Sequence, residues 1–173
     1  MAVSLYDLTV PSYLQTLGAM EGVLSKGAAH CKEKGIDPNE IVETKLAPDM
    51  LPFRFQVVAV AHHSAGALKG VKAGAFGPPS PSTADYAGLQ KLVTEAREAV
   101  EKASATELNA CAGKDVIFSV GDRKLPFTAE GFLQTFSLPN FFFHATTAYD
   151  ILRTNGVPLG KRDFMGRMKM KKG

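Results

Sequence analysis

The sequence is poor in cysteine and has no cysteine motif. Its only two cysteines, Cys31 and Cys111, lie far apart and match neither a metal-binding nor a redox spacing. This spacing excludes a Cys-x-x-Cys centre. With so few cysteines in a chain of 173 residues, we expect reduced thiols in a cytoplasmic protein.

Other common signatures are also missing. No apolar run reaches the ~18 residues of a membrane-spanning helix, and the first residues lack the basic and apolar segments of a signal peptide. There is no Gly-rich phosphate loop after a strand and no G-x-S-x-G motif. The carboxylates lie mostly on charged faces or near helix ends, so no acid/base pair stands out. We expect no membrane partner, and whether the protein is an enzyme stays open.

The remaining composition is that of a folded domain. Hydrophobic residues make up 45% and charged residues 21% of the chain, which is ordinary for a globular protein. The net charge is +3, but residues 161–173 carry +5 and the rest of the chain carries −2. We therefore divide the chain into one domain, residues 1–160, and a basic tail, residues 161–173. Phe164 is the only aromatic residue among the tail charges, so we expect no nucleic-acid partner.

Apolar periodicity predicts a mainly helical fold. Pro11 suits a first helical turn, Gly35 a left-handed cap, and Pro139 a kink or break in the last helix. The alternation in residues 115–127, around a turn at Gly121-Asp122, predicts a small β-hairpin. The predicted helices, of which four are long enough to form a four-helix bundle, span about residues 11–34, 38–45, 49–71, 82–104 and 128–154. Residues 74–83, rich in Pro, Gly and Ser, are predicted to form a loop.

Two of the four histidines are predicted to face the interior. At ~100° per residue, His63 lies opposite the charged side of its helix, on the face of Gln56, and His144 lies on the face of Phe141 and Ala148. Two inward imidazoles on different helices can share a divalent metal such as zinc, nickel or iron. The alternative is two half-buried histidines that are each satisfied by a hydrogen bond.

Three further features enter the site prediction. His62 points closer to the charged side and is the alternate ligand to His63. The residues Gln56, Phe141 and Ala148, on the histidine-bearing faces, are the predicted lining of a small ligand pocket. The run Phe141-Phe142-Phe143 covers most of a helix circumference, so at least one ring faces the core and another is available to a partner or a pocket.

Three segments resemble an uncharacterised domain-of-unknown-function family within the DinB-like, or YfiT-like, helical-bundle superfamily. They are SLYDLTVPSYLQTLGAMEGVLSKGAAH, LAPDMLPFRFQVVAVA and LPNFFFHATTAYDILRTNGVPLGKRDFMG. The resemblance covers most of the chain. It implies a four-helix bundle with a long crossover, often dimeric, so that we expect a homodimer.

The same resemblance implies metal-dependent chemistry. Characterised members of the superfamily include thiol transferases and a maleylpyruvate isomerase, whose metal is held by one histidine of the second helix and a His-x-x-x-His pair of the last. His63, or else His62, matches the first ligand, and His144 matches the first histidine of the pair. The second histidine is replaced by Ala148. A third ligand would have to come from Gln56, Tyr149, Asp150 or water.

Two hypotheses follow. In the favoured one, the protein is a metal-free small-molecule-binding or interaction protein with a degenerate metal site. In the alternative, it is a metal-dependent enzyme of the thiol transferase or isomerase type that uses His63 and His144. Metal content distinguishes the two.

Overall fold

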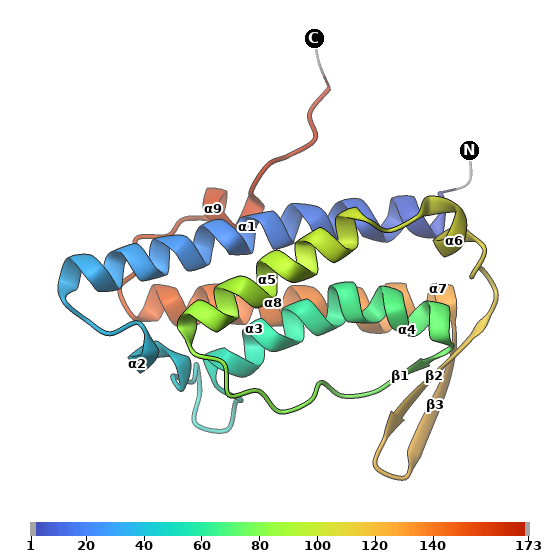
Figure 1. Cartoon of the computed structure of the whole chain (residues 1–173), viewed down its shortest axis with the longest axis horizontal. Coiled ribbons are helices and arrows are strands. Elements are labelled where there is room, and N and C mark those ends of the chain that lie inside the picture. The colour runs from blue at the N-terminus through green and yellow to red at the C-terminus, as the bar shows by residue number, and fades with distance from the viewer. Residues whose placement is uncertain (1–2, 172–173) are drawn as a thin grey trace.

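The structure, a computed structural model, describes residues 3–171 and is mainly helical with one small sheet (Figure 1). The helices are α1 (Leu5–Lys34), α2 (Asn39–Val42), α3 (Phe53–Ala61), η1 (His62–Gly66), α4 (Ala67–Ala73), α5 (Tyr86–Glu101), α6 (Ala105–Asn109), α7 (Ala129–Gly131), η2 (Phe132–Ser137), α8 (Leu138–Thr154) and α9 (Lys161–Met165). The strands are β1 (Ala75–Phe76), β2 (Asp115–Val120) and β3 (Arg123–Thr128). In this part of the chain no helix is both long and apolar enough to cross a bilayer.

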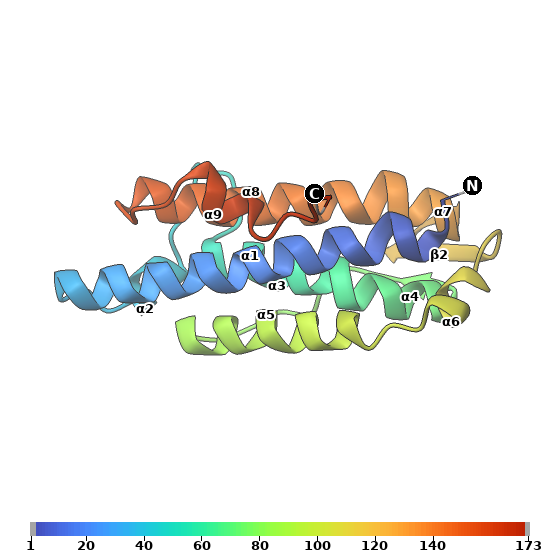
Figure 2. The same ribbon diagram turned by 90° about the horizontal axis from the view of Figure 1, so that it is seen from above.

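The long helices lie alongside one another, with α1 between α5 and α8 in the view from above (Figures 1 and 2). The segment from α3 to α4 packs against both α5 and α8. Buried apolar side chains from all of these helices form one continuous core. The mainly helical prediction is therefore confirmed.

The first helix begins earlier than predicted. It starts at Leu5, because the Ser4 hydroxyl caps it by accepting a hydrogen bond from the Asp7 amide at 3.1 Å. Pro11 consequently lies inside the helix and not in its first turn. The side chain of Pro11 and the residue one turn before it, Asp7, are both exposed, so water can satisfy the carbonyl that Pro11 leaves without an amide. Gly35 ends the helix with φ of 68°, as predicted.

Two helical segments contain π-helical turns that periodicity did not predict. The turn η1 lies between α3 and α4, and η2 lies between α7 and α8. Pro139 is the second residue of α8, which begins directly after η2. At the predicted kink or break near Pro139, the structure has a π-turn within a continuous run of helix. The wider turn accommodates a residue that has no amide proton.

The sheet contains the predicted hairpin and one additional strand. Strands β2 and β3 are antiparallel around the turn at Gly121-Asp122, which confirms the hairpin. The prediction of a loop over residues 74–83 was wrong at Ala75–Phe76, which form β1 and pair with β2 in parallel register. Two residues are too few to show an alternating pattern, and Phe76 is held there by burial of its ring to 8% exposure.

The first part of the predicted basic tail packs on the domain. Helix α9 lies against α1, where Lys26 pairs with Asp163 at 2.6 Å and Gln15 Nε2 donates to the Met165 carbonyl at 2.8 Å. The ring of Phe164 meets that of Tyr149 edge to face, with centroids 5.9 Å apart.

A buried chain of hydrogen bonds connects α1 with both π-turns. The Ser137 hydroxyl, at the end of η2, donates to the backbone carbonyl of His63 in η1 at 2.7 Å. Ser137 has one hydroxyl proton, so the Tyr13 hydroxyl, 2.8 Å away, is the donor to Ser137 Oγ. Tyr13 and Ser137 are both fully buried, and burial raises the pKa of the Tyr13 phenol, which keeps it protonated as the donor.

We predict unequal losses of stability when the middle member of this series of hydrogen bonds, Ser137, and its first donor, Tyr13, are replaced. Ser137→Ala leaves the Tyr13 hydroxyl and the His63 carbonyl without this partner and should lower the free energy of unfolding by about 2–3 kcal/mol. Tyr13→Phe keeps the bond from Ser137 to His63 and should cost about 1 kcal/mol. Urea denaturation measures both. The exposed control Ser25→Ala should change stability by less than about 0.5 kcal/mol, and equal losses for Ser137→Ala and Tyr13→Phe would contradict the direction of the chain.

Candidate functional site

The structure brings His63 and His144 together inside the helical core. Their ring centroids are 5.8 Å apart and their planes differ by 17°. His63 is 6% exposed, and His144 is half-buried. The two histidines predicted from helical angle to face the interior are therefore neighbours, one from η1 and the other from α8.

The hydrogen bonds of His144 define its protonation state. Its Nδ1 lies 2.7 Å from Gln56 Oε1, and Gln56 Nε2 donates to the Leu51 carbonyl at 2.7 Å. The Leu51 carbonyl can only accept, so it orients the Gln56 amide with its oxygen toward His144. His144 Nδ1 therefore carries the proton, and in the neutral ring Nε2 has the free lone pair.

His63 is less well satisfied. Its Nδ1 is buried and has no hydrogen-bond partner. Burial, together with the neighbouring charges of His62 and His144 when these are protonated, lowers the pKa of His63 to about 3. Burial alone lowers the pKa of His144 to about 4. Both imidazoles are accordingly neutral at pH 7.

His62, the alternate ligand, is already used in packing. Its Nε2 donates to the Gly77 carbonyl at 2.7 Å, and its ring stacks on Phe76 with centroids 4.3 Å apart. His62 thereby holds strand β1 and the start of the following segment against η1. Burial lowers the pKa of this histidine as well.

The residues around the pair do not supply a third metal ligand. Ala148, one turn after His144, is fully buried and has no donor atom. Gln56 is engaged at both ends of its amide, and Tyr149 packs on Phe164. Between residues 3 and 171 no group of three or more His, Cys, Asp and Glu side chains is placed to hold a metal ion. Two imidazoles are fewer than the three protein ligands of a catalytic zinc site, so the donor set does not fit that metal centre.

The residues predicted to line a ligand pocket belong to the interior. Phe141 and Ala148 are both fully buried and Gln56 is 2% exposed, so these side chains are part of the core. Phe141 meets Tyr13 edge to face at 5.0 Å. Phe142 and Phe143 are 38% and 56% exposed, so one ring of the aromatic run is in the core and two face outward.

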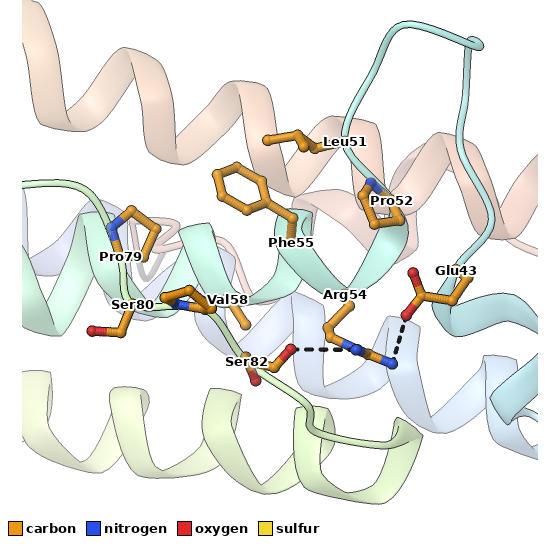
Figure 3. A pocket seen from close by; sticks show the side chains of 10 residues that line it. Glu43, Leu51, Pro52, Arg54, Phe55, Val58, Pro79, Ser80 and Ser82 are labelled. Atoms are coloured by element: carbon orange, nitrogen blue, oxygen red, sulfur yellow. Dashed lines mark hydrogen bonds and ion pairs between the residues drawn. The ribbon is translucent and has the colours of Figure 1, made fainter.

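A cavity of about 310 Å³ is lined in part by Phe55 (Figure 3). The ring of Phe55 also contacts that of His144, with centroids 5.7 Å apart. Three segments form the cavity: the residue that follows α2, the start of α3, and the Pro-rich segment between β1 and α5. Its lining consists of Glu43, Leu51, Pro52, Arg54, Phe55, Val58, Pro79, Ser80, Pro81 and Ser82. Such a mainly apolar cavity with a few polar groups is typical of small-molecule sites.

Arg54 is the polar centre of this cavity. Its Nη2 pairs with Glu43 Oε1 at 2.6 Å and its Nη1 donates to the Ser82 carbonyl at 3.3 Å (Figure 3). Its Nε is buried without a partner. Helical periodicity places Arg54 on the charged side of its helix, opposite His63. The available signals were an arginine in the first turn of an apolar helix and a Pro-rich segment, and neither shows that the two are in contact.

Comparison with known proteins identifies the family. A family model described as domain of unknown function (DUF1993) matches residues 5–165. The chain belongs to this family. A crystal structure of a DinB family member protein from Shewanella denitrificans is 26% identical, with a TM-score of 0.79 over 98% of this chain and 96% of that chain. Among curated proteins, none matches. The resemblance to an uncharacterised family with a DinB-like fold is confirmed.

The histidine pair predicts acid sensitivity of the fold. Its folded-state pKa values of about 3 and 4 lie below the ordinary value of 6.5, so the unfolded chain binds more protons in acid. The contribution to stability is complete above pH ~6.5 and is lost as the pH falls toward the folded-state values. Between pH 7 and pH 5 we expect a loss of about 1–2 kcal/mol for each histidine.

Urea denaturation at pH 7, 6 and 5 tests this expectation. His144→Gln should lose less stability over this range than the wild type. His30→Gln, which removes a histidine outside the pair, should follow the wild type. A wild-type free energy of unfolding that stays constant from pH 7 to pH 5 would show that the imidazoles are not desolvated as described.

Proposed function

We propose that this protein is a metal-free small-molecule-binding protein on a DinB-like four-helix-bundle scaffold. Its ligand occupies the cavity between the start of α3 and the Pro-rich segment. The observation that carries the proposal is the cavity itself, which combines apolar walls with one guanidinium group. Its volume of about 310 Å³ is at the lower end of the range for organic ligands.

The chemistry of the histidine pair supports a role without metal. Two neutral imidazoles and a buried alanine occupy the positions where the resemblance implies three ligands. Gln56 binds His144 Nδ1 and, in the absence of a third donor, holds the ring in place. The pair then supports Phe55, whose ring contacts His144 and whose side chain also lines the cavity.

Metal loading tests this proposal against a metal-dependent enzyme. After incubation with zinc, nickel or iron salts and removal of free metal, elemental analysis should find well below one metal ion per chain. Ala148→His restores the His-x-x-x-His spacing and, where it folds, should gain zinc. About one metal per wild-type chain, lost in both His63→Ala and His144→Ala, would contradict the proposal and establish the alternative.

Occupation of the cavity is tested by titrating isotope-labelled protein with a library of small aromatic compounds in NMR spectra. The amide signals of Leu51, residues 53–58, Ser80 and Ser82 should shift together. Val58→Trp places a large side chain in the cavity and should abolish these shifts. Val120→Trp, at an exposed site on the hairpin, should leave them unchanged. Binding at this site would be refuted if no compound shifts the cavity signals, or if the shifts in Val58→Trp equal those in the wild type.

A further inference from the structure

The two partners of the ion pair in the cavity are unequally exposed to solvent. Glu43 is 64% exposed and Arg54 is 27% exposed, so the acid lies at the rim while the base is largely enclosed. An ion pair with one solvent-exposed partner contributes little to stability, since the carboxylate is nearly as well solvated when it is free. Glu43 can therefore leave Arg54 at small cost when another carboxylate arrives.

The guanidinium has unused hydrogen-bonding capacity. Of its five N–H groups, the structure pairs one with Glu43 and one with Ser82, and the N–H of Nε has no partner. Glu43 contacts it through a single oxygen, Oε1. A carboxylate that approaches from the cavity can bind two N–H groups side by side, which is the stronger geometry for an arginine.

The walls of the cavity are mainly apolar, so they favour a carboxylate whose remaining atoms are apolar. Phe55, Val58 and Pro79 provide apolar surfaces of the cavity (Figure 3). Pro79 and Pro81 restrict the backbone angles of the segment that lies beside Arg54. This side of the cavity therefore has a defined shape. Arg54 and Glu43 are the two charged residues of the lining, and Arg54 is the more enclosed.

We propose that the ligand is a small monocarboxylate with a flat apolar body, whose carboxylate replaces that of Glu43 on Arg54. This inference rests on the proposed small-molecule-binding function and adds the chemical class of the ligand. In the free protein, Glu43 neutralises the guanidinium and keeps the cavity open. In the complex, the apolar body lies against Phe55 and Val58, and Glu43 turns to solvent.

Three compounds of one shape test the class of ligand: 2-naphthoate, 2-naphthamide and 2-naphthylmethylamine. Calorimetry and NMR titration of the full chain should show that the carboxylate binds at least tenfold more tightly than the amide and the amine. Equal or tighter binding of the amide or the amine in this cavity would overturn the inference while leaving small-molecule binding intact. If none of the three compounds, and no member of the wider aromatic library, shifts a cavity signal, the proposed function itself fails.

Two substitutions with opposite expected effects test the exchange. Arg54→Gln should weaken 2-naphthoate binding at least tenfold. Glu43→Gln removes the internal competitor and should strengthen binding about threefold to tenfold. Lys91→Gln and Glu98→Gln change the net charge in the same way on the exposed face of α5 and should leave the affinity within about twofold of the wild type.

The Glu43→Gln result keeps the test decisive if Arg54→Gln proves unfolded by circular dichroism. If Glu43 competes with the ligand for Arg54, its removal must raise the affinity for 2-naphthoate. Weaker or unchanged binding of 2-naphthoate by Glu43→Gln would therefore overturn the proposed exchange. A carboxylate that shifts signals of the C-terminal residues 167–171 instead of the cavity would show that it binds the basic tail, and would overturn the assignment of the site.

Discussion

The hydrogen bond from Ser137 to the backbone carbonyl of His63 joins the two π-turns, and the placement of the histidine pair depends on it. Each π-turn changes the rotation of its helix at the point where the helix enters the core. The Tyr13 hydroxyl fixes the Ser137 side chain from α1, so three separate helical segments share one buried polar contact. Because the Tyr13 hydroxyl, the Ser137 hydroxyl and the His63 carbonyl are all paired with one another, the core can enclose these three groups at little cost.

The consequence of this arrangement is an enclosed pair of neutral imidazoles among aromatic rings. His63 contacts Phe76 and Phe136, and His144 contacts Phe55 and Phe143. Desolvation by these neighbours keeps the rings uncharged at pH 7. The same enclosure would suit a metal-binding imidazole, but only two donors converge here, and the buried Ala148 closes the position of a third. The chain thus has the fold of a DinB family member, with two neutral imidazoles in its core.

A second group of polar contacts lies at the start of α3, where Arg54 pairs with Glu43 and donates a hydrogen bond to Ser82 of the Pro-rich segment. Phe55 connects the two regions, because one side of its ring faces His144 and its side chain also lines the cavity. The enclosed guanidinium and the exposed carboxylate are unequal partners, and this inequality distinguishes the pair from the surface ion pair of Lys91 and Glu95 on α5.

Much of the local structure could be predicted from the sequence, because it depends on neighbouring residues. Periodicity located the long helices, Gly35 marked the end of the first, and Gly121-Asp122 marked the hairpin turn. Helical angle was sufficient to bring His63 and His144 together, since an apolar face must turn inward. The capping of α1 by Ser4 was missed because Pro11 gave a stronger but misleading signal for a helix start.

The features that carry the proposed chemistry were decided by tertiary structure alone. The π-turns depend on a hydrogen bond between residues 74 positions apart, and β1 depends on burial of Phe76 against the hairpin. The cavity is formed by Glu43, Arg54 and Ser82, which no local pattern connects. By itself the sequence determined which faces are apolar and which residues can act chemically. Only the packed chain decided which of those residues are in contact, because contacts between distant segments arise from filling a common core rather than from the preferences of each segment.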